Sequence, residues 1–181
     1  MKKVVFLAIA TLFAASMAFA ATNGSIGIFA DPAGTNCNLP GTPGFVSYYF
    51  VHVNAIGATA SQWAAPAPTC MMAVRLADMP VFAVNFGNTA TGITIGYPTC
   101  KTGTFHIMSS LYQVVSAGQC CRWSVIPDPS LGSGKIEIPD CFYVMAYGTG
   151  GAGIVNMMPS CPCNVPTEET TWGQVKALYT E

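Results

Sequence analysis

Charged side chains are scarce in this sequence. Asp, Glu, Lys and Arg make up 8% of its 181 residues, against about 25% in ordinary soluble domains. Beyond Lys2 and Lys3 the basic residues are scattered, which excludes the basic patch that binds nucleic acid or anionic lipid headgroups. Weak charge repulsion makes self-association plausible. The alternative is a small protein locked by disulfides, which needs little charge to stay in solution.

The motifs of catalysis and metal binding are also missing. No Gly-x-Ser-x-Gly elbow occurs, and Gly132-Ser133-Gly134-Lys135 lacks the Ser or Thr that follows the lysine of a phosphate-binding loop. Asp128 and Asp140 stand beside prolines and favour turns, and the other carboxylates form no cluster for calcium or glycoside hydrolysis. We therefore predict no catalytic residue, no metal and no cofactor.

His52 and His106 are the only histidines of the chain. A small secreted hydrolase, the alternative function class, would need one of them as a base beside a serine or threonine that folding brings close. Both histidines lie inside apolar stretches predicted to be strands, where packing or simple exposure is the commoner role. We therefore expect a protein that is not an enzyme.

The first 20 residues have the three parts of a secretory signal peptide. Met1-Lys2-Lys3 is a positive start, Val4 to Ala15 is an apolar run, and Ala18-Phe19-Ala20 is a small-x-small cleavage site. The run is too short to span a bilayer, and no later segment reaches the roughly 18 apolar residues of a membrane helix. The sequence predicts an exported protein without a membrane span, secreted, at the cell exterior or in the periplasm.

Eight cysteines follow this leader, and an even cysteine set in an exported chain predicts disulfides. Their Cys-Cys and Cys-x-Cys spacings differ from the Cys-x-x-Cys pairs of zinc sites and redox motifs. The candidates are Cys37, Cys70, Cys100, Cys120, Cys121, Cys141, Cys161 and Cys163.

Sequence alone does not select among the pairings of these cysteines, but strand geometry reduces the number of possible pairings. Adjacent Cys120 and Cys121 would point to opposite faces of a strand and so should bond different partners. We expect Cys37 to bond Cys70. The remaining expected bonds join Cys100 to one of the adjacent pair and Cys141 to the other, which leaves Cys161 and Cys163 for one another or for earlier cysteines.

Alternation of apolar and polar residues with a period of two dominates the rest of the chain. It is clear over 81–86, 92–97 and 135–138, which are therefore predicted to be half-buried strands. Phe45 to Val53 is apolar on both faces, which indicates a central strand covered on both sides. Thr104 to Val115 forms a longer strand whose alternation slips at Ser109-Ser110, so we expect a bulge there.

Prolines and glycines that favour turns separate these stretches at 38–44, 65–68, 127–129 and 132–134. Short strands at spacings near ten residues are typical of a sandwich or a barrel. We predict an all-β fold, a single antiparallel β-sandwich of about nine strands over residues 21–163, stapled by disulfides.

The final segment, residues 164–181, departs from this pattern. Trp172, Val175 and Tyr179 recur at helical spacing, so we predict a linker and a short C-terminal helix that docks through these residues. An alternative is a terminal tag that an anchoring or export system recognises. Elsewhere, Trp63, Trp123 and Tyr97 are candidate binding aromatics, because exposed flat rings stack on sugars or anchor a protein partner.

Three segments carry a resemblance. Gly57-Ala58-Thr59-Ala60-Ser61-Gln62-Trp63, residues 81–88 and Thr170-Thr171-Trp172-Gly173-Gln174-Val175-Lys176-Ala177-Leu178-Tyr179 resemble a group of small, cysteine-bearing exported bacterial proteins. The group has a GATASQ segment followed by Trp or Phe and a TTWGxxKALY ending, and it has no established activity. More distantly, the strand order is similar to that of immunoglobulin-like, cohesin-like and carbohydrate-binding sandwich modules. No calcium or sugar motif of those modules matches, so this second likeness implies fold alone.

These observations together favour an exported non-catalytic module of the cell exterior with a structural, adhesive or ligand-binding role. Its partner would be an extracellular protein or a glycan. A self-assembling surface or fibre subunit is one form of this hypothesis, and the small hydrolase is its alternative.

Overall fold

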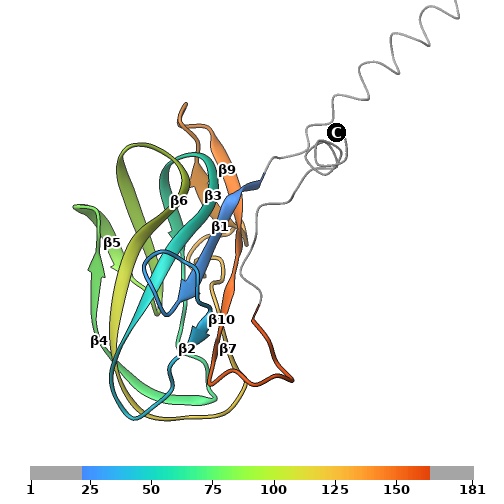
Figure 1. The fold of residues 1–181 in the computed structure, drawn as a ribbon. Coiled ribbons are helices and arrows are strands. Elements are labelled where there is room, and N and C mark those ends of the chain that lie inside the picture. The colour runs from blue at the N-terminus through green and yellow to red at the C-terminus, as the bar shows by residue number, and fades with distance from the viewer. Residues whose placement is uncertain (1–21, 164–181) are drawn as a thin grey trace, which may run out of the picture.

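Every regular element in the described part of the chain is a β-strand (Figure 1). The computed structural model describes residues 22–163. Its ten strands are β1 (Thr22–Phe29), β2 (Asn38–Leu39), β3 (Gly44–Trp63), β4 (Met71–Pro80), β5 (Val84–Asn88), β6 (Gly92–Ala117), β7 (Cys121–Ser124), β8 (Ile136–Pro139), β9 (Met145–Gly150) and β10 (Ala152–Val155). The predicted leader and the C-terminal segment with Trp172, Val175 and Tyr179 lie outside the described residues. Within 22–163, no helix is long and apolar enough to cross a membrane.

The strands form a seven-stranded and a three-stranded sheet. The large sheet has the order β1-β9-β8-β3-β6-β4, with β5 beside β6, and the small sheet has the order β2-β10-β7. Strand β1 pairs with β9 in parallel and with β3 in antiparallel fashion, so β1, β9, β8 and β3 close into a ring. The all-β prediction is therefore confirmed. The expected purely antiparallel arrangement is not, because β1–β9 and β2–β10 are parallel pairs.

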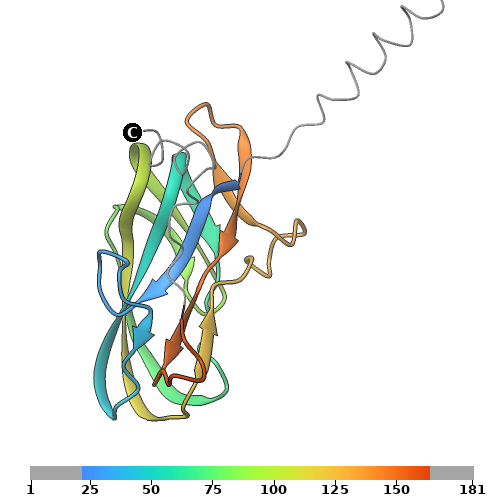
Figure 2. The same ribbon diagram turned by 45° about the vertical axis from the view of Figure 1, so that its right-hand side comes forward.

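Strands β3 and β6 are much longer than predicted and bend together. Their antiparallel ladder runs from Gly44 opposite Val114 to Trp63 opposite Ile93, with repeated register shifts between His52 and Ala60. At this bend Asn54 and Gly103 adopt positive φ angles of 54° and 76°, which lets the backbone turn without ending the pairing. Figures 1 and 2 show both strands bending at one end of the molecule, with β4 beside one half of β6 and β5 beside the other.

Aromatic side chains fill the interior between these halves. Trp123 lies edge-on to Tyr48 and Tyr112, with ring centroids 4.9 and 5.1 Å away, while Phe50 stacks on Trp63 at 4.8 Å. Both tryptophans are completely buried, and Tyr97 is 7% exposed. The three candidate binding aromatics are therefore core residues. Their position follows from strand parity, because they alternate with the half-buried or exposed Gln62, Arg122 and Gly96.

All eight cysteines form disulfides, but not in the expected pairs. The bonds are Cys37–Cys163, Cys70–Cys121, Cys100–Cys141 and Cys120–Cys161. The expected bonds from Cys37 to Cys70, from Cys100 to the adjacent pair and from that pair to Cys141 are wrong. The bonds follow strand pairing and not sequence proximity. Strand β2, next to Cys37, pairs with β10, which precedes Cys163, so these two cysteines come together. That Cys120 and Cys121 bond different partners is confirmed.

Candidate functional site

His52, one of the two candidate bases for a hydrolase, is part of a buried polar network. Its Nε2 lies 2.9 Å from the Asn23 carbonyl oxygen and its Nδ1 lies 3.2 Å from the Tyr97 hydroxyl. That hydroxyl donates to Ser61 Oγ at 2.8 Å, which also accepts the Trp63 indole N–H. His52 and Ser61 are fully buried. Because no substrate reaches them, the network is structural.

Burial also sets the protonation of this histidine. Desolvation lowers the pKa of His52 to about 4, outweighing the hydrogen bond to Asn23, which acts in the opposite direction. The neutral imidazole therefore links β3 to β1 and β6 throughout the neutral pH range. Burial likewise raises the pKa of Tyr97.

This pKa predicts an acid-sensitive fold. The folded value lies below the unfolded value of 6.5, so the contribution of His52 is complete above pH 6.5 and is lost as pH falls toward 4. We expect the free energy of unfolding to drop by about 2 kcal/mol between pH 7 and pH 5, where carboxylates do not yet titrate. Guanidinium titrations at several pH values measure this change in the free energy of unfolding.

His52→Gln should remove the pH dependence of the free energy of unfolding, and His106→Gln is the matched control that should keep it. An equally steep pH dependence in the His52→Gln variant would contradict the role given to His52.

His106 occupies an open position on β6. Its Nε2 lies 3.1 Å from Ser109 Oγ, and its ring packs edge-on against Tyr49. Within residues 22–163 no carboxylate bonds to His106, and the three main pockets of this region are lined by neither histidine. A catalytic base that acts on serine needs an orienting partner and a bound substrate. The described geometry gives the hydrolase alternative no support.

One candidate binding surface is the outer face of the sheet formed by β4, β6 and β3. We define this outer face as Met72 and Val74 of β4, Leu111, Gln113 and Val115 of β6, and Phe45, Ser47 and Tyr49 of β3. Val74, Gln113 and Phe45 lie in one row across the three strands. Phe45 is 73% exposed, and Met72, Val74 and Val115 are each more than half exposed. Isolated exposed apolar residues are ordinary, but a contiguous group indicates a docking surface.

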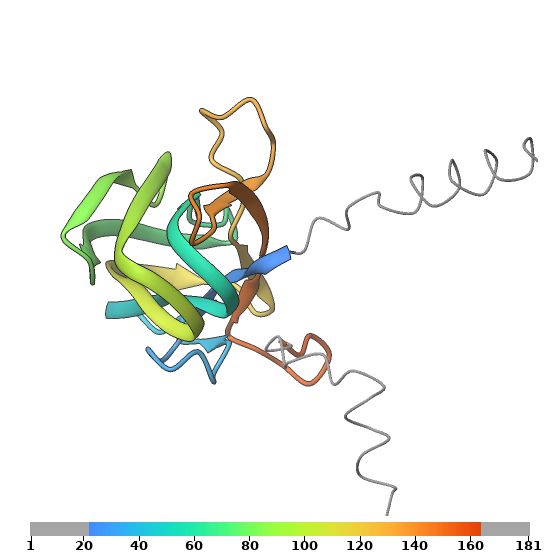
Figure 3. The same cartoon turned by 90° about the horizontal axis from the view of Figure 1, so that it is seen from above.

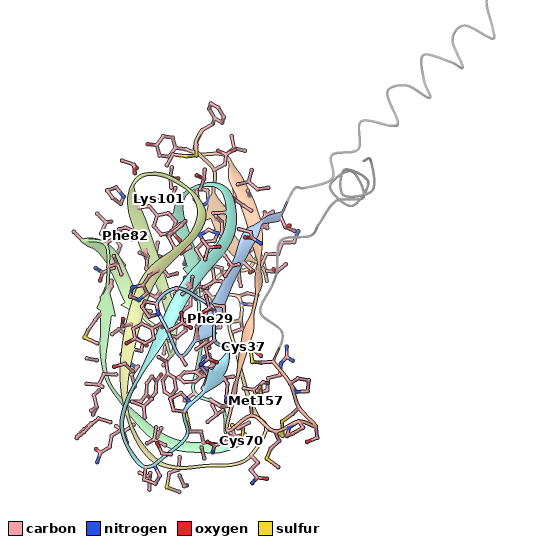
Figure 4. The ribbon with its side chains drawn as sticks, in the orientation of Figure 1. Phe29, Cys37, Cys70, Phe82, Lys101 and Met157 are labelled. Atoms are coloured by element: carbon pink, nitrogen blue, oxygen red, sulfur yellow. A yellow bond between two sulfur atoms is a disulfide. The ribbon has the colours of Figure 1, made fainter. Side chains whose placement is uncertain are left out.

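The same side of β3 is covered farther along the strand. Val51 and Val53 are buried under Phe29 and the Cys37–Cys163 disulfide, which form a small second core; Figure 4 shows Phe29 and Cys37 close together beside β1. The expectation that Phe45 to Val53 is covered on both faces therefore holds only for this part. The disulfide and β1 leave the half of the sheet around Phe45 open.

The edge strand of this sheet, β4, is poorly suited to pairing with a further strand. Strand β4 pairs only with β6 in the described region, and its register shifts twice, between Met72 and Ala73 and between Arg75 and Ala77. It ends at Pro80, which lacks a backbone donor. Bulges and prolines disturb the flat row of donors and acceptors that a further strand requires. The face, and not the edge, is therefore the candidate for docking.

A second exposed apolar group lies at the turn between β8 and β9. We define the hairpin tip as Phe142, Tyr143, Val144 and Met145, all of which are exposed. The preceding Asp140 accepts hydrogen bonds from the backbone N–H groups of Phe142 and Val144 at 2.8 and 2.9 Å. A pocket of about 250 Å³ beside the tip is lined in part by Ile56, Cys141 and Phe142.

The turn roles predicted for two aspartates agree with the structure. Asp140 organises the hairpin tip, and Asp128 accepts hydrogen bonds from Gln62 and from both Ser130 donors. Partial burial raises the pKa of Asp128, but these hydrogen bonds outweigh it and hold the pKa below its usual range. Among residues 22–163, no group of three or more His, Cys, Asp or Glu side chains is arranged to hold a metal ion.

Sequence reasoning missed both exposed apolar groups. For the hairpin tip a signal existed, because Pro139-Asp140 predicts a turn and the next residues are Phe142-Tyr143-Val144-Met145. Bulky apolar residues in a turn have no core to enter. For the outer face no comparable signal exists, since Phe45 continues a stretch that is buried a few residues later.

The fold is similar to that of cohesin modules. A non-cellulosomal cohesin from the hyperthermophilic archaeon Archaeoglobus fulgidus matches with a TM-score of 0.50 and 10% identity, over 75% of this chain and 91% of the cohesin. A cohesin module from a family 33 glycoside hydrolase of Clostridium perfringens matches with a TM-score of 0.49 and 3% identity, over 76% of this chain and all of the module. No protein-family model and no curated protein matches the chain. The likeness concerns the fold, which is all-β and cohesin-like with four disulfides.

Proposed function

We propose that this chain is an exported, non-catalytic module that binds a protein partner through the outer face of β4, β6 and β3. The observation that carries the proposal is the contiguous apolar surface around Phe45, Val74 and Val115 on a disulfide-braced sheet. The four disulfides add support, because they brace the sheets and so keep this surface rigid. In this proposal the first 20 residues are a signal peptide and residues 21–163 are the binding domain.

A protein suits this surface better than a glycan. Sugars are recognised by flat aromatic rings with nearby hydrogen-bonding groups, and the tryptophans of the described region are buried. The most exposed apolar side chains of the outer face are one phenylalanine, one methionine and two valines, and its second aromatic ring, Tyr49, is half-buried. Methionine adapts to irregular apolar partners, and a buried aromatic anchor at the centre of an interface contributes strongly to protein binding.

Site-directed photocrosslinking tests the proposal. A photoreactive phenylalanine analogue at Val74 of the mature oxidised protein is irradiated with the envelope and secreted fractions of the source cells. We expect a discrete adduct that excess unlabelled wild-type protein suppresses. Because hot-spot residues contribute 2 kcal/mol or more, Phe45→Asp/Val74→Asp should be at least about 30-fold weaker as a competitor.

The control competitor is Ser133→Asp, which adds charge to the exposed β7–β8 loop, seen extending from the body in Figure 3. It should compete as well as the wild type. Equal competition by the outer-face variant, or the lack of any adduct that the wild type suppresses, would overturn the proposal. An adduct with the mass of two chains would identify a second copy as the partner and support the self-assembling form of the hypothesis.

A further inference from the structure

The hairpin tip exposes more apolar surface than any other turn in the described region. Phe142 is 85% exposed, Tyr143 82% and Val144 61%, and neighbouring Ile56 on the bend of β3 is 68% exposed. Ile56 and Phe142 line the same pocket, so the two elements form one apolar end. Figures 1 and 2 show the β8–β9 turn projecting beyond the bends of β3 and β6.

Hydrogen bonds and a disulfide hold the hairpin tip in this exposed conformation. The Asp140 carboxylate fixes two backbone N–H groups of the tip, and its own backbone N–H donates to the Val144 carbonyl oxygen. Thr59 Oγ1 donates to the carbonyl oxygens of Pro139 and Asp140. The Cys100–Cys141 disulfide ties the tip to β6, and Gly57 of β3 leaves room for it, because a Cβ at Gly57 would lie 2.8 Å from the Cys141 sulfur.

Tyr143 adopts a left-handed conformation with φ of 61°. A bulky residue in that region costs about 1 kcal/mol or more. The fold thus holds Phe142 and Tyr143 outward in a strained turn where a flexible loop would turn them inward. An outward apolar tip that is maintained against this cost indicates a contact outside the molecule.

We propose that the hairpin tip inserts into the interfacial layer of a lipid bilayer and holds the module at a membrane surface without spanning it. The tip and the chain from Cys141 to Cys163 have no charged residue, and the Asp140 carboxylate at the base of the tip is hydrogen-bonded to two backbone N–H groups. The nearby turn of β6 carries one cation, Lys101, and exposes the uncharged side chains of Thr99, Thr102 and Thr104. Apolar side chains below a rim of neutral hydroxyls match the acyl and headgroup layers of a bilayer, and tyrosine is favoured at their boundary.

A protein pocket fits the tip less well. A specific interface needs about 800 Å² on each partner, and four residues of a turn supply only a part of that area. The rest would come from the threonines around the tip, and polar contacts of this kind contribute little affinity. Lipid insertion requires no wider interface, because each inserted side chain gains its own transfer free energy.

The chemistry of the tip also predicts how such binding depends on salt. Lys101, in the neighbouring turn of β6, lies over the Phe82 ring at 5.8 Å, and Figure 4 shows the two side by side below the tip. Without a basic cluster, apolar insertion is the main source of binding. Affinity should therefore be nearly independent of ionic strength and similar for neutral and anionic vesicles.

Vesicle flotation of the mature oxidised protein tests this inference. The probes are vesicles of phosphatidylcholine alone and of phosphatidylcholine with phosphatidylglycerol. We expect the wild type to float with both, at low and high salt. Phe142→Ser/Tyr143→Asn should lower the partition coefficient at least about tenfold, because burying one phenylalanine is worth more than the 1.4 kcal/mol of a tenfold change. Asparagine is chosen because it tolerates positive φ.

Two controls make the result decisive. Phe45→Ser removes a comparably exposed ring from the outer face and should leave flotation unchanged, which separates this inference from the proposed protein-binding face. Guanidinium titration should show that the tip variant unfolds like the wild type. Failure of the wild type to float, or equal flotation of the tip variant, would overturn the inference. So would weaker competition by the tip variant in the photocrosslinking assay without vesicle binding, because the tip would then contact protein.

Discussion

Replacing Trp123 with alanine should lower the free energy of unfolding by about 4 kcal/mol, a large part of the 5–15 kcal/mol that stabilises a typical domain. The indole is fully buried and touches three aromatic neighbours, Tyr48, Phe50 and Tyr112. The substitution leaves a cavity among three strands. It also removes the indole N–H that donates to the Ala65 carbonyl oxygen at 3.2 Å, so a buried acceptor loses its partner.

Guanidinium titration of the oxidised protein measures this loss. Phe142→Ala, which truncates an equally apolar but exposed ring, is the matched control and should change stability by no more than about 0.5 kcal/mol. A Trp123→Ala protein as stable as this control would show that the indole is not part of a closely packed core. The same reasoning explains why tryptophan truncation is a poor probe of binding here: the variants would test folding.

Removing the Cys37–Cys163 disulfide should have an effect of similar or larger size. The bond spans 126 residues, more than any of the other three. The chain-entropy relation gives about 5 kcal/mol for a loop of this length. Cys37 is 3% exposed and packs with Phe29, Val51 and Val53. Alanine is therefore the better replacement at both positions, because it places no hydroxyl group in this second core.

The matched control for Cys37→Ala/Cys163→Ala is Cys120→Ala/Cys161→Ala, which opens a bond spanning 41 residues and should cost about 1 kcal/mol less. Denaturant titration and peptide mapping of the unreduced protein measure stability and confirm the remaining three bonds. A Cys37→Ala/Cys163→Ala protein as stable as the wild type would contradict the expected role of this bond.

Local patterns in the sequence were sufficient to predict the class of the fold. The alternation at 92–97 and 135–138 corresponds to strands, and the prolines at 66, 68, 127 and 129 lie between strands. These features depend on neighbours within a few residues. The bend of β3 and β6 was missed because glycine and Tyr97-Pro98 are ordinary turn signals, whereas here the two strands bend together and keep their ladder. The expected bulge near Ser109 lies instead between His106 and Met108.

Long-range features could not be predicted in this way. Cys37 bonds Cys163 because β2, which follows Cys37, pairs with β10, which precedes Cys163, and no local pattern specifies a parallel pair between the two ends of the domain. Which aromatic side chains are exposed could not be predicted for a related reason. Trp123 alternates with Arg122 and Ser124, which favours burial, but the exposure of Phe45 depends on how far the Cys37 loop extends over β3. The C-terminal docking segment remains a prediction.

The closed ring of β1, β9, β8 and β3 has a consequence for biogenesis. In an exported chain, as proposed above, β1 would leave the translocation channel long before β9, which is one of its two neighbours in the sheet. Contacts between residues so distant in sequence slow folding, and the edge of β1 that pairs with β9 stays unpaired until β9 is available. A nascent chain that stalls before residue 145 has no β9 to complete the ring. Its unpaired edge would then stay open to aggregation or proteolysis until the C-terminal strands follow.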